Sequence, residues 1–176
     1  MKIEQLMTRD VRTVGPDDRL DRAAQLMWEA DCGCLPVVDG DQHVVGMITD
    51  RDVCMAAWTQ GRALCELPVR GAMSSRVISC APSDATVRAE RLMRDHQVRR
   101  VPVVDGQALL VGLLSLNDLA LAAQPGSGTR DVRPDEVADT LAAVGRRPAT
   151  GPGDDARQQQ PASQPVAARS SLIARG

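Results

Sequence analysis

The chain contains the stretch Val98-Arg99-Arg100-Val101-Pro102-Val103-Val104-Asp105-Gly106, followed after a short gap by Val111-Gly112-Leu113-Leu114-Ser115-Leu116-Asn117-Asp118. The same pattern occurs once before, as Leu35-Pro36-Val37-Val38-Asp39-Gly40 and then Val45-Gly46-Met47-Ile48-Thr49-Asp50-Arg51-Asp52. Equivalent positions, such as Pro36 and Pro102, are separated by a constant 66 residues. A gapless internal repeat of this kind indicates that one structural unit has been duplicated.

Length and composition limit what such a chain can be. Its 176 residues suffice for one domain, or for two small half-domains that share a core. The sequence has no Phe or Tyr, and Trp28 and Trp58 are its only aromatic residues, so the core must be aliphatic. A net charge of −2 and a pI near 5.7 argue against a nucleic-acid-binding protein, which normally carries an excess of basic residues.

The N-terminal sequence and the cysteines both predict a cytoplasmic protein. Glu4 lies where a signal peptide would begin its apolar region, and no apolar run approaches the 18 residues of a membrane span. The five cysteines form an odd-numbered set with irregular spacing, which suits a reducing compartment better than a disulfide framework.

Hydrophobic periodicity and turn residues predict the same order of elements in both copies, namely a lead-in, β, α, β, β, α. For the first copy the ranges are a lead-in helix within 1–10, a strand over 11–14, a helix from 20 to about 31, strands at 35–38 and 44–48, and a helix from 49–50. For the second copy they are a lead-in over 67–73, a strand at 77–80, a helix over 86–96, strands at 100–105 and 109–115, and a helix over 116–123. This is an α/β (α+β) fold of two β-α-β-β-α repeats, 1–60 and 67–124. Because each copy is too small for a core of its own, we expect the two to pack as a pseudo-twofold pair through their sheets.

The sequence changes character after the second repeat. Residues 125–145 read as a linker with one further amphipathic helix over 131–144, in which Pro134 and two acidic residues suit the first turn. From 146 to 176 Pro, Gly, Ala, Gln and Ser dominate, and we expect this tail to be disordered.

Each repeat places a hydroxyl and a carboxylate three residues apart where the last strand meets a helix: Thr49 with Asp52, and Ser115 with Asp118. The hydroxyl and the unpaired N–H groups of a first helical turn suit a phosphate, and the carboxylate can accept hydrogen bonds from both hydroxyls of a ribose. Together with an aliphatic slot, these groups indicate a nucleoside phosphate site. The alternative is that the hydroxyls are N-caps and the carboxylates are ordinary first-turn acids.

These motifs together resemble a known family, the tandem cystathionine β-synthase (CBS) domain pair or Bateman module. The resemblance covers roughly residues 5 to 123. It rests on the M-x-x-x-V starts, the Pro-x-Asp turns, the h-P-V-V-D-G strands and the G-h-h-(T/S)-x-x-D endings, each present twice and in order. The T-D-R-D and H-Q-V-R-R-V-P-V segments resemble stand-alone CBS proteins of actinobacterial type.

The resemblance implies a regulatory module that senses an adenosyl ligand of the AMP, ATP, NAD or S-adenosylmethionine class, bound between the repeats, and signals to a partner protein. Carried over by position, the better site would use Arg99, Arg100, Leu113, Ser115, Asn117 and Asp118, closed by Cys32 and Gly33 from repeat 1. The second site would use Thr49, Arg51, Asp52 and Val98. Repeat 1 has Gly33-Cys34 where repeat 2 has Arg99-Arg100, so the second site lacks the basic pair. We therefore expect a phosphorylated ligand at the first site.

The cysteines and the tryptophans each have a specific and a less specific interpretation. Cys32, Cys34 and nearby His43 could indicate zinc or redox sensing, but their spacing matches no standard zinc site, and small buried cysteines are the better interpretation. We expect no metal site and no covalent cofactor.

Trp28 and Trp58 are expected at a homodimer contact, with partial burial in the monomer as the alternative. The sequence contains no catalytic motif, so no enzyme is predicted. The rival hypothesis is a ligand-free dimeric interaction or stress-associated scaffold protein.

Overall fold

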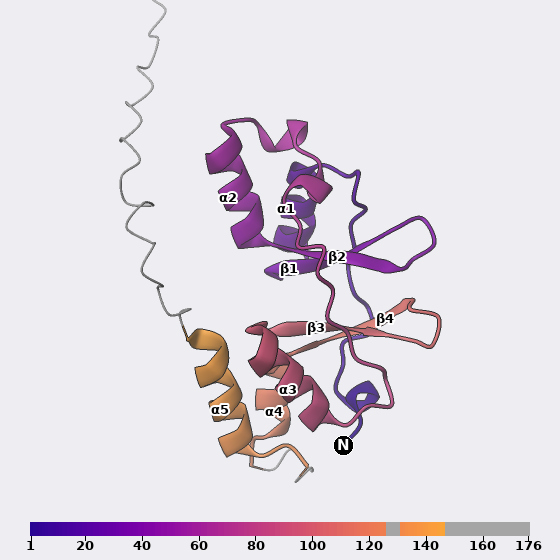
Figure 1. The fold of residues 1–176 in the computed structure, drawn as a ribbon, viewed down its shortest axis with the longest axis vertical. Helices are drawn as coiled ribbons and strands as arrows, with labels where there is room; N and C mark the ends of the chain where they lie inside the picture. The colour runs from indigo at the N-terminus through magenta and orange to yellow at the C-terminus, as the bar shows by residue number, and fades with distance from the viewer. Residues whose placement is uncertain (126–130, 147–176) are drawn as a thin grey trace, which may run out of the picture. The chain divides into compact units, whose positions relative to one another are not determined.

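The computed structural model describes residues 1–125 and 131–146 and confirms the predicted mixture of helices and strands (Figure 1). Apart from Arg146, the tail predicted to be disordered lies outside the described residues. The elements of the first repeat and of the connection to the second are η1 (Ile3–Gln5), α1 (Leu20–Glu29), β1 (Cys34–Val38), β2 (Val44–Thr49), α2 (Asp50–Gln60), η2 (Leu64–Glu66) and η3 (Val69–Gly71), where η denotes a 3₁₀ turn. Those that follow are α3 (Thr86–His96), β3 (Arg100–Val104), β4 (Leu110–Ser115), α4 (Leu116–Ala122) and α5 (Pro134–Gly145).

Each repeat contains one antiparallel hairpin with the same register. Pro36 lies opposite Met47 in β1–β2, and Pro102 lies opposite Leu113 in β3–β4. The Asp-Gly turns are held by their aspartates, because Asp105 Oδ1 accepts hydrogen bonds from the backbone N–H groups of Gln107 and Leu109 at 2.9 and 3.0 Å. The Val-Val-Asp-Gly sequence therefore sets the hairpin in both copies.

The strands predicted at 11–14 and 77–80 are each reduced to a single bridging residue. Val14 bridges Val37 in parallel, donating to the Pro36 carbonyl at 3.2 Å and accepting from the Val38 N–H at 3.0 Å. A longer parallel ladder would need N–H donors at Pro36 on one side and at Pro16 on the other, and proline has none. The equivalent prolines of repeat 2, Pro82 and Pro102, limit the Cys80 bridge to Val103 in the same way.

The two lead-in segments cross between the repeats. The predicted lead-in helix within 1–10 is only the 3₁₀ turn η1, because the chain then leaves to pair with repeat 2, where the Thr8 N–H donates to the Leu113 carbonyl at 2.9 Å. In the opposite direction, η3 joins repeat 1, and the Val69 N–H donates to the Asp18 carbonyl at 2.8 Å. Each repeat is therefore completed by a segment that precedes the other in the sequence.

Two hydrophobic cores result from this exchange. Ile3 and Met7 are buried in the core of repeat 2, while Leu67 and Val69 are buried in the core of repeat 1. The expectation that neither copy buries a core alone has a structural basis in these side chains.

Helix α5 confirms the helix predicted near 131–144 and packs on repeat 2. Arg94 Nη1 of α3 donates to Thr140 Oγ1 at 3.0 Å, and Gln97 Nε2 donates to the carbonyls of Ala143 and Arg146 at 3.4 and 3.0 Å. Figure 1 shows α5 beside α3 and α4. Among the described residues, no helix combines the length and the apolar character that a bilayer crossing requires.

Candidate ligand-binding cleft between the repeats

The predicted hydroxyl–carboxylate pairs form the same capping box in both copies. Ser115 Oγ donates to Asp118 Oδ2 at 2.7 Å and accepts from the Asp118 N–H at 3.2 Å, while the Ser115 N–H also donates to Asp118 Oδ2, at 2.8 Å. Thr49 and Asp52 make the equivalent bonds at 2.7, 3.3 and 2.9 Å. Helix capping is therefore one role of both pairs, and a ligand role depends on where each pair lies.

Ser115 and Asp118 line a cavity of about 210 Å³ to which both repeats contribute. Repeat 2 supplies Arg100, Leu113, Ser115 and Asp118. Repeat 1 and the segment leading into it supply Thr8, Asp10, Val11, Arg12, Ala30, Cys32, Cys34 and Leu35. We refer to this cavity as the inter-repeat cleft. It combines a hydroxyl, carboxylates, guanidinium groups and aliphatic side chains.

Only one member of the predicted arginine pair lines the cleft. Arg100 begins β3 and lies directly opposite Ser115 in the register of the hairpin. Arg99 lines a separate cavity next to α5, together with Arg100, Ser115 and Asn117. Successive side chains of an extended chain alternate between its two faces, which is consistent with Arg100 alone lining the cleft although both arginines line the cavity next to α5.

The cleft carries charges of both signs. Arg12 adds a second guanidinium to that of Arg100, and Asp10 adds a second carboxylate to that of Asp118. Burial raises the pKa of the Cys34 thiol to about 11, although the nearby Arg100 guanidinium lowers it in part. At neutral pH Cys34 is therefore a neutral wall of the cleft.

The remaining predicted site residues lie elsewhere. Gly33 lines a groove between α1 and α2 of repeat 1, whereas Cys32 borders both that groove and the cleft. The residues assigned to the second site, Thr49, Arg51, Asp52 and Val98, are outside the inter-repeat cleft. The structure thus brings together Cys32, Arg100, Leu113, Ser115 and Asp118 from the predicted better site.

Sequence reasoning missed the contribution of residues 8–12, of which Arg12 is the most consequential because of its charge. These residues reach the cleft through the pairing of Thr8 with Leu113 on β4. The repeated M-x-x-x-V start marked this segment but did not reveal that it crosses to the other repeat. Cys34 and Leu35 were also missed, although they directly follow the predicted Cys32 and Gly33.

The five cysteines differ in burial, and Cys32 is half-buried. Cys34 and Cys80 are buried, and burial raises the pKa of the Cys80 thiol to about 11 as well. Such thiols are protonated at neutral pH, unlike the thiolates of metal or redox sites. Cys54 and Cys65 are exposed, so the expectation of small buried cysteines is wrong for these two.

The structure brings together one cluster of three potential metal ligands among the described residues, and it contains no cysteine. Within the described ranges, Asp39, Asp41 and His43 have ligand atoms within 4.8 Å of one another. Asp39 Oδ1 is already engaged by the backbone N–H groups of Asp41 and His43 at 3.0 and 2.9 Å. The equivalent Asp105 makes the same bonds where no histidine is present, so the turn itself accounts for this arrangement.

Comparison with known proteins gives consistent matches. The family model described as "CBS domain" matches twice, over residues 3–58 and 69–124. The CBS domain-containing protein YhcV of Bacillus subtilis is 41% identical over 120 residues, which cover 68% of this chain and 83% of YhcV. The structure of a putative signal-transduction protein with CBS domains from Burkholderia ambifaria matches with a TM-score of 0.64 and 33% identity, over 69% of this chain and 93% of that one. The crystal structure of CBSX2 in complex with AMP matches with a TM-score of 0.61 and 26% identity, over 69% and 95%.

Proposed function

Since the chain belongs to the CBS-domain family through both of its repeats, we propose that it senses an adenosine-containing ligand in the inter-repeat cleft and signals the bound state to a partner protein. A tandem CBS pair is a regulatory module, and CBSX2 was solved in complex with AMP. The observation that carries the proposal is the joint lining of one cavity by Arg100, Ser115 and Asp118 of repeat 2 and by aliphatic residues of repeat 1.

The groups of the cleft match the parts of an adenine nucleotide. In the proposal, Arg100 and Ser115, neighbours across the β3–β4 hairpin, bind the phosphate, for which a guanidinium is better suited than a thiol. Asp118 accepts hydrogen bonds from the ribose hydroxyls. Val11, Leu35 and Leu113 provide apolar contacts for the adenine ring. AMP, ATP, NAD and S-adenosylmethionine all share the adenosine part.

The ligand must also fit around the capping box. Asp118 Oδ2 accepts hydrogen bonds from the Ser115 N–H and hydroxyl, whereas Asp118 Oδ1 has no hydrogen-bond partner among the described residues. Asp118 therefore has one oxygen for the helix cap and one for a ribose. The volume of about 210 Å³ is below the roughly 300 Å³ at which sites for drug-sized ligands begin. A complete nucleotide would consequently extend beyond the cleft.

The proposal describes a sensor and not an enzyme. The Ser115 hydroxyl donates to the capping carboxylate of Asp118, and the Cys34 thiol stays protonated. Neither group is prepared as a nucleophile. We place the protein in the cytoplasm, which the five free cysteines support.

Isothermal titration calorimetry with AMP, ATP, NADH and S-adenosylmethionine tests the proposal. We expect Asp118→Ala to weaken binding by about 10- to 100-fold, as the loss of charge-assisted hydrogen bonds would do. Asp52→Ala is the matched control because it removes an equivalent capping box outside the cleft. For the same reason, we expect Arg100→Ala to weaken ligand binding more than Arg99→Ala does. Flat traces at millimolar concentrations of every ligand, from folded protein, would refute the proposal.

The second candidate is a ligand-free dimeric interaction or stress-associated scaffold. The exposure of both tryptophans favours it, since Trp28 is 88% and Trp58 69% exposed. Large exposed aromatic side chains are typical of contact surfaces. Under either candidate we propose that the chain forms a homodimer, which sedimentation of the wild type and of Trp58→Ala would test. Flat titrations combined with a stable dimer would select the scaffold.

A further inference from the structure

Helices α3 and α5 lie side by side (Figure 1), and two polar contacts between them join residues that are 46 positions apart in the sequence. Arg94 Nη1 donates to Thr140 Oγ1 at 3.0 Å, and about one turn further along both helices Gln97 Nε2 donates to the Ala143 carbonyl at 3.4 Å. Since the partners follow in the same order on both helices, α3 and α5 run in the same direction.

This register brings two glutamates together, Glu90 of α3 and Glu136 of α5, one turn before Arg94 and Thr140. Glu90 is 1% exposed, and its Oε2 has no hydrogen-bond partner among the described residues. A carboxylate that is buried without a partner is costly, and a second carboxylate nearby adds repulsion. The pair therefore opposes the packing of α5 on α3 when both groups are ionised.

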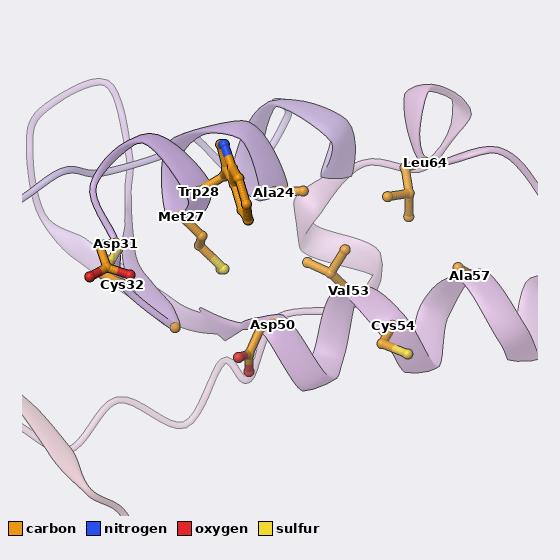
Figure 2. A pocket seen from close by; sticks show the side chains of 11 residues that line it. Ala24, Met27, Trp28, Asp31, Cys32, Asp50, Val53, Cys54, Ala57 and Leu64 are labelled. Atoms are coloured by element: carbon orange, nitrogen blue, oxygen red, sulfur yellow. The ribbon is translucent and has the colours of Figure 1, made fainter.

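The duplicated fold does not require a carboxyl group at this position. A shift of 66 residues relates the two repeats, and the equivalent of Glu90 is Ala24 of α1. Ala24 lines the groove between α1 and α2, together with the apolar side chains of Met27 and Val53 (Figure 2). Helices α1 and α3 each pack on the first strand of their own hairpin, but α5 packs on α3. The role of Glu90 is therefore to be sought in the docking of α5.

Two charged groups act on Glu90 across and along this interface. Burial raises the pKa of the Glu90 carboxyl group, the Glu136 carboxylate raises it further, and the Arg94 guanidinium partly offsets both effects. Glu136 itself forms an ion pair with Arg133, whose Nη1 lies 3.9 Å from Glu136 Oε1. The charge that faces Glu90 from α5 is therefore negative.

The other charged residues of the elements around Glu90 lie at the surface or at other sites. Arg100 of β3 and Asp118 of α4 line the inter-repeat cleft. His96 is half-buried, but it lies six residues after Glu90 and off the helix face that Glu90 shares with Arg94. The remaining charged residues of α3 and α5 are exposed, namely Arg88, Arg91, Asp95, Asp135 and Asp139.

We propose that Glu90 makes the docking of α5 dependent on protons: α5 is held against α3 while Glu90 carries a proton and is released when Glu90 ionises. Release exposes the Glu90 carboxylate to water. It also removes Val137 and Leu141 from the cavity of about 370 Å³ that contains Arg99 and Asn117, so that this cavity loses one wall. The inference is independent of nucleotide binding, because Glu90 does not line the inter-repeat cleft.

The direction of the pH dependence follows from burial. Glu90 is solvated when α5 is released and therefore ionises at a lower pH than it does under the docked helix. Docking is fully favourable below the ordinary pKa of 4.5 and weakens as the pH rises toward the higher pKa of the docked state. The released fraction of α5 should thus increase with pH.

Hydrogen–deuterium exchange of the full chain between about pH 4 and pH 8 tests the proposal, read by mass spectrometry on the peptide that contains residues 134–145. The wild type is compared with Glu90→Gln, which cannot ionise. Both proteins yield the same α5 peptide, so its intrinsic exchange rates cancel in the ratio. We expect the ratio of wild-type to variant exchange to grow at least about tenfold from pH 4 to pH 7, since a pKa raised by one corresponds to a factor of ten.

Two further variants define the cause. Asp95→Asn removes an exposed carboxylate from the same helix and should keep the wild-type profile. Glu136→Gln removes the facing charge and should reduce the pH dependence without abolishing it, because burial is the larger cause. A wild-type to Glu90→Gln ratio that does not change with pH would overturn the proposal.

A second readout separates the release of α5 from the unfolding of repeat 2. In the wild type at neutral pH, the α5 amides should be at least about tenfold less protected against exchange than those of β3 and β4, because α5 opens while the strands stay paired. Equal protection of α5 and of the strands would mean that α5 opens only when the whole repeat unfolds, and it would overturn the proposal as well.

Discussion

Gly112 lies where the N-terminal segment crosses β4, and Gly46 lies at the equivalent crossing of β2. A Cβ atom at Gly112 would be 2.6 Å from Met7 Sδ and 2.9 Å from the Thr8 carbonyl oxygen. The methionine can move, but the carbonyl belongs to the backbone that pairs with Leu113. The glycine of the G-h-h-(T/S)-x-x-D motif is therefore required by the close approach of two chain segments.

We predict that Gly112→Ala lowers the free energy of unfolding by about 1–3 kcal/mol, the usual cost of overpacking. Urea denaturation followed by circular dichroism measures it. Gly106→Ala is the control, since a Cβ at Gly106 meets nothing within 4 Å. If the two variants were equally stable, the close approach of the N-terminal segment would not be the reason why position 112 requires glycine.

Glu90 of α3 is buried, only 1% exposed, and its Oε2 has no hydrogen-bond partner among the described residues. Burial raises the pKa of its carboxyl group above the ordinary value of 4.5; the Glu136 carboxylate adds to this effect and the Arg94 guanidinium partly offsets it. A raised pKa means that the unfolded chain ionises first. The folded state therefore loses stability as the pH rises from about 4.5 through the folded pKa.

We predict that Glu90→Gln, which cannot ionise, loses less stability than the wild type over this pH range. The stability difference between the two proteins should be small at pH 4 and should grow toward neutrality in favour of the variant. Urea unfolding at a series of pH values measures it, with the exposed Glu29→Gln as control. Parallel pH profiles for the wild type and Glu90→Gln would show that the buried carboxyl group is not responsible.

At the scale of elements, α5 is joined to α3 by a long-range hydrogen bond in a partly buried setting. Arg94 Nη1 donates to Thr140 Oγ1 at 3.0 Å, and Thr140 is fully buried. A double-mutant cycle with Arg94→Met and Thr140→Val should give a coupling energy of about 1 kcal/mol. The exposed pair Arg62 and Glu66 should give a clearly smaller coupling in a parallel cycle. If the changes in unfolding free energy caused by Arg94→Met and Thr140→Val were additive, this hydrogen bond would not stabilise the packing of α5 on α3.

The sequence predicted the elements where local signals and tertiary structure agree. The apolar spacing of α1 and α3, the β-branched strands and the Asp-Gly turns each specify their element locally. The prediction of full strands at 11–14 and 77–80 was wrong because strand pairing also depends on the partner strand. The partner strands contain Pro36 and Pro102, which have no N–H to donate. Periodicity alone cannot report a missing donor on another strand.

The candidate cleft was predictable to a similar extent. Three cleft residues were predicted from their places next to strands. Ser115 and Asp118 belong to the motif that ends one strand, and Arg100 lies where another strand begins. The alternation of an extended chain could have separated Arg100 from Arg99 before the structure was known. Arg12 could not be found this way, because its position depends on the crossing of residues 1–8 into repeat 2.

At the scale of the whole molecule, the crossed lead-ins make each core depend on both repeats. Ile3 and Met7 complete the core of repeat 2, and Leu67 and Val69 complete that of repeat 1. Unfolding one repeat would withdraw its lead-in from the other and expose the apolar side chains there. We therefore expect the pair to unfold as one cooperative unit.

The two buried cysteines allow this to be measured, because Cys34 belongs to repeat 1 and Cys80 to repeat 2. Pulsed thiol labelling across a urea series, read by peptide mass spectrometry, should give coincident midpoints for the two thiols. Gly112→Ala, although it lies in repeat 2, should lower both midpoints by the same amount, whereas Gly106→Ala should leave both unchanged. If Cys80 became reactive at lower urea than Cys34, or if Gly112→Ala shifted Cys80 alone, the repeats would be separate folding units and the crossed segments would not couple them.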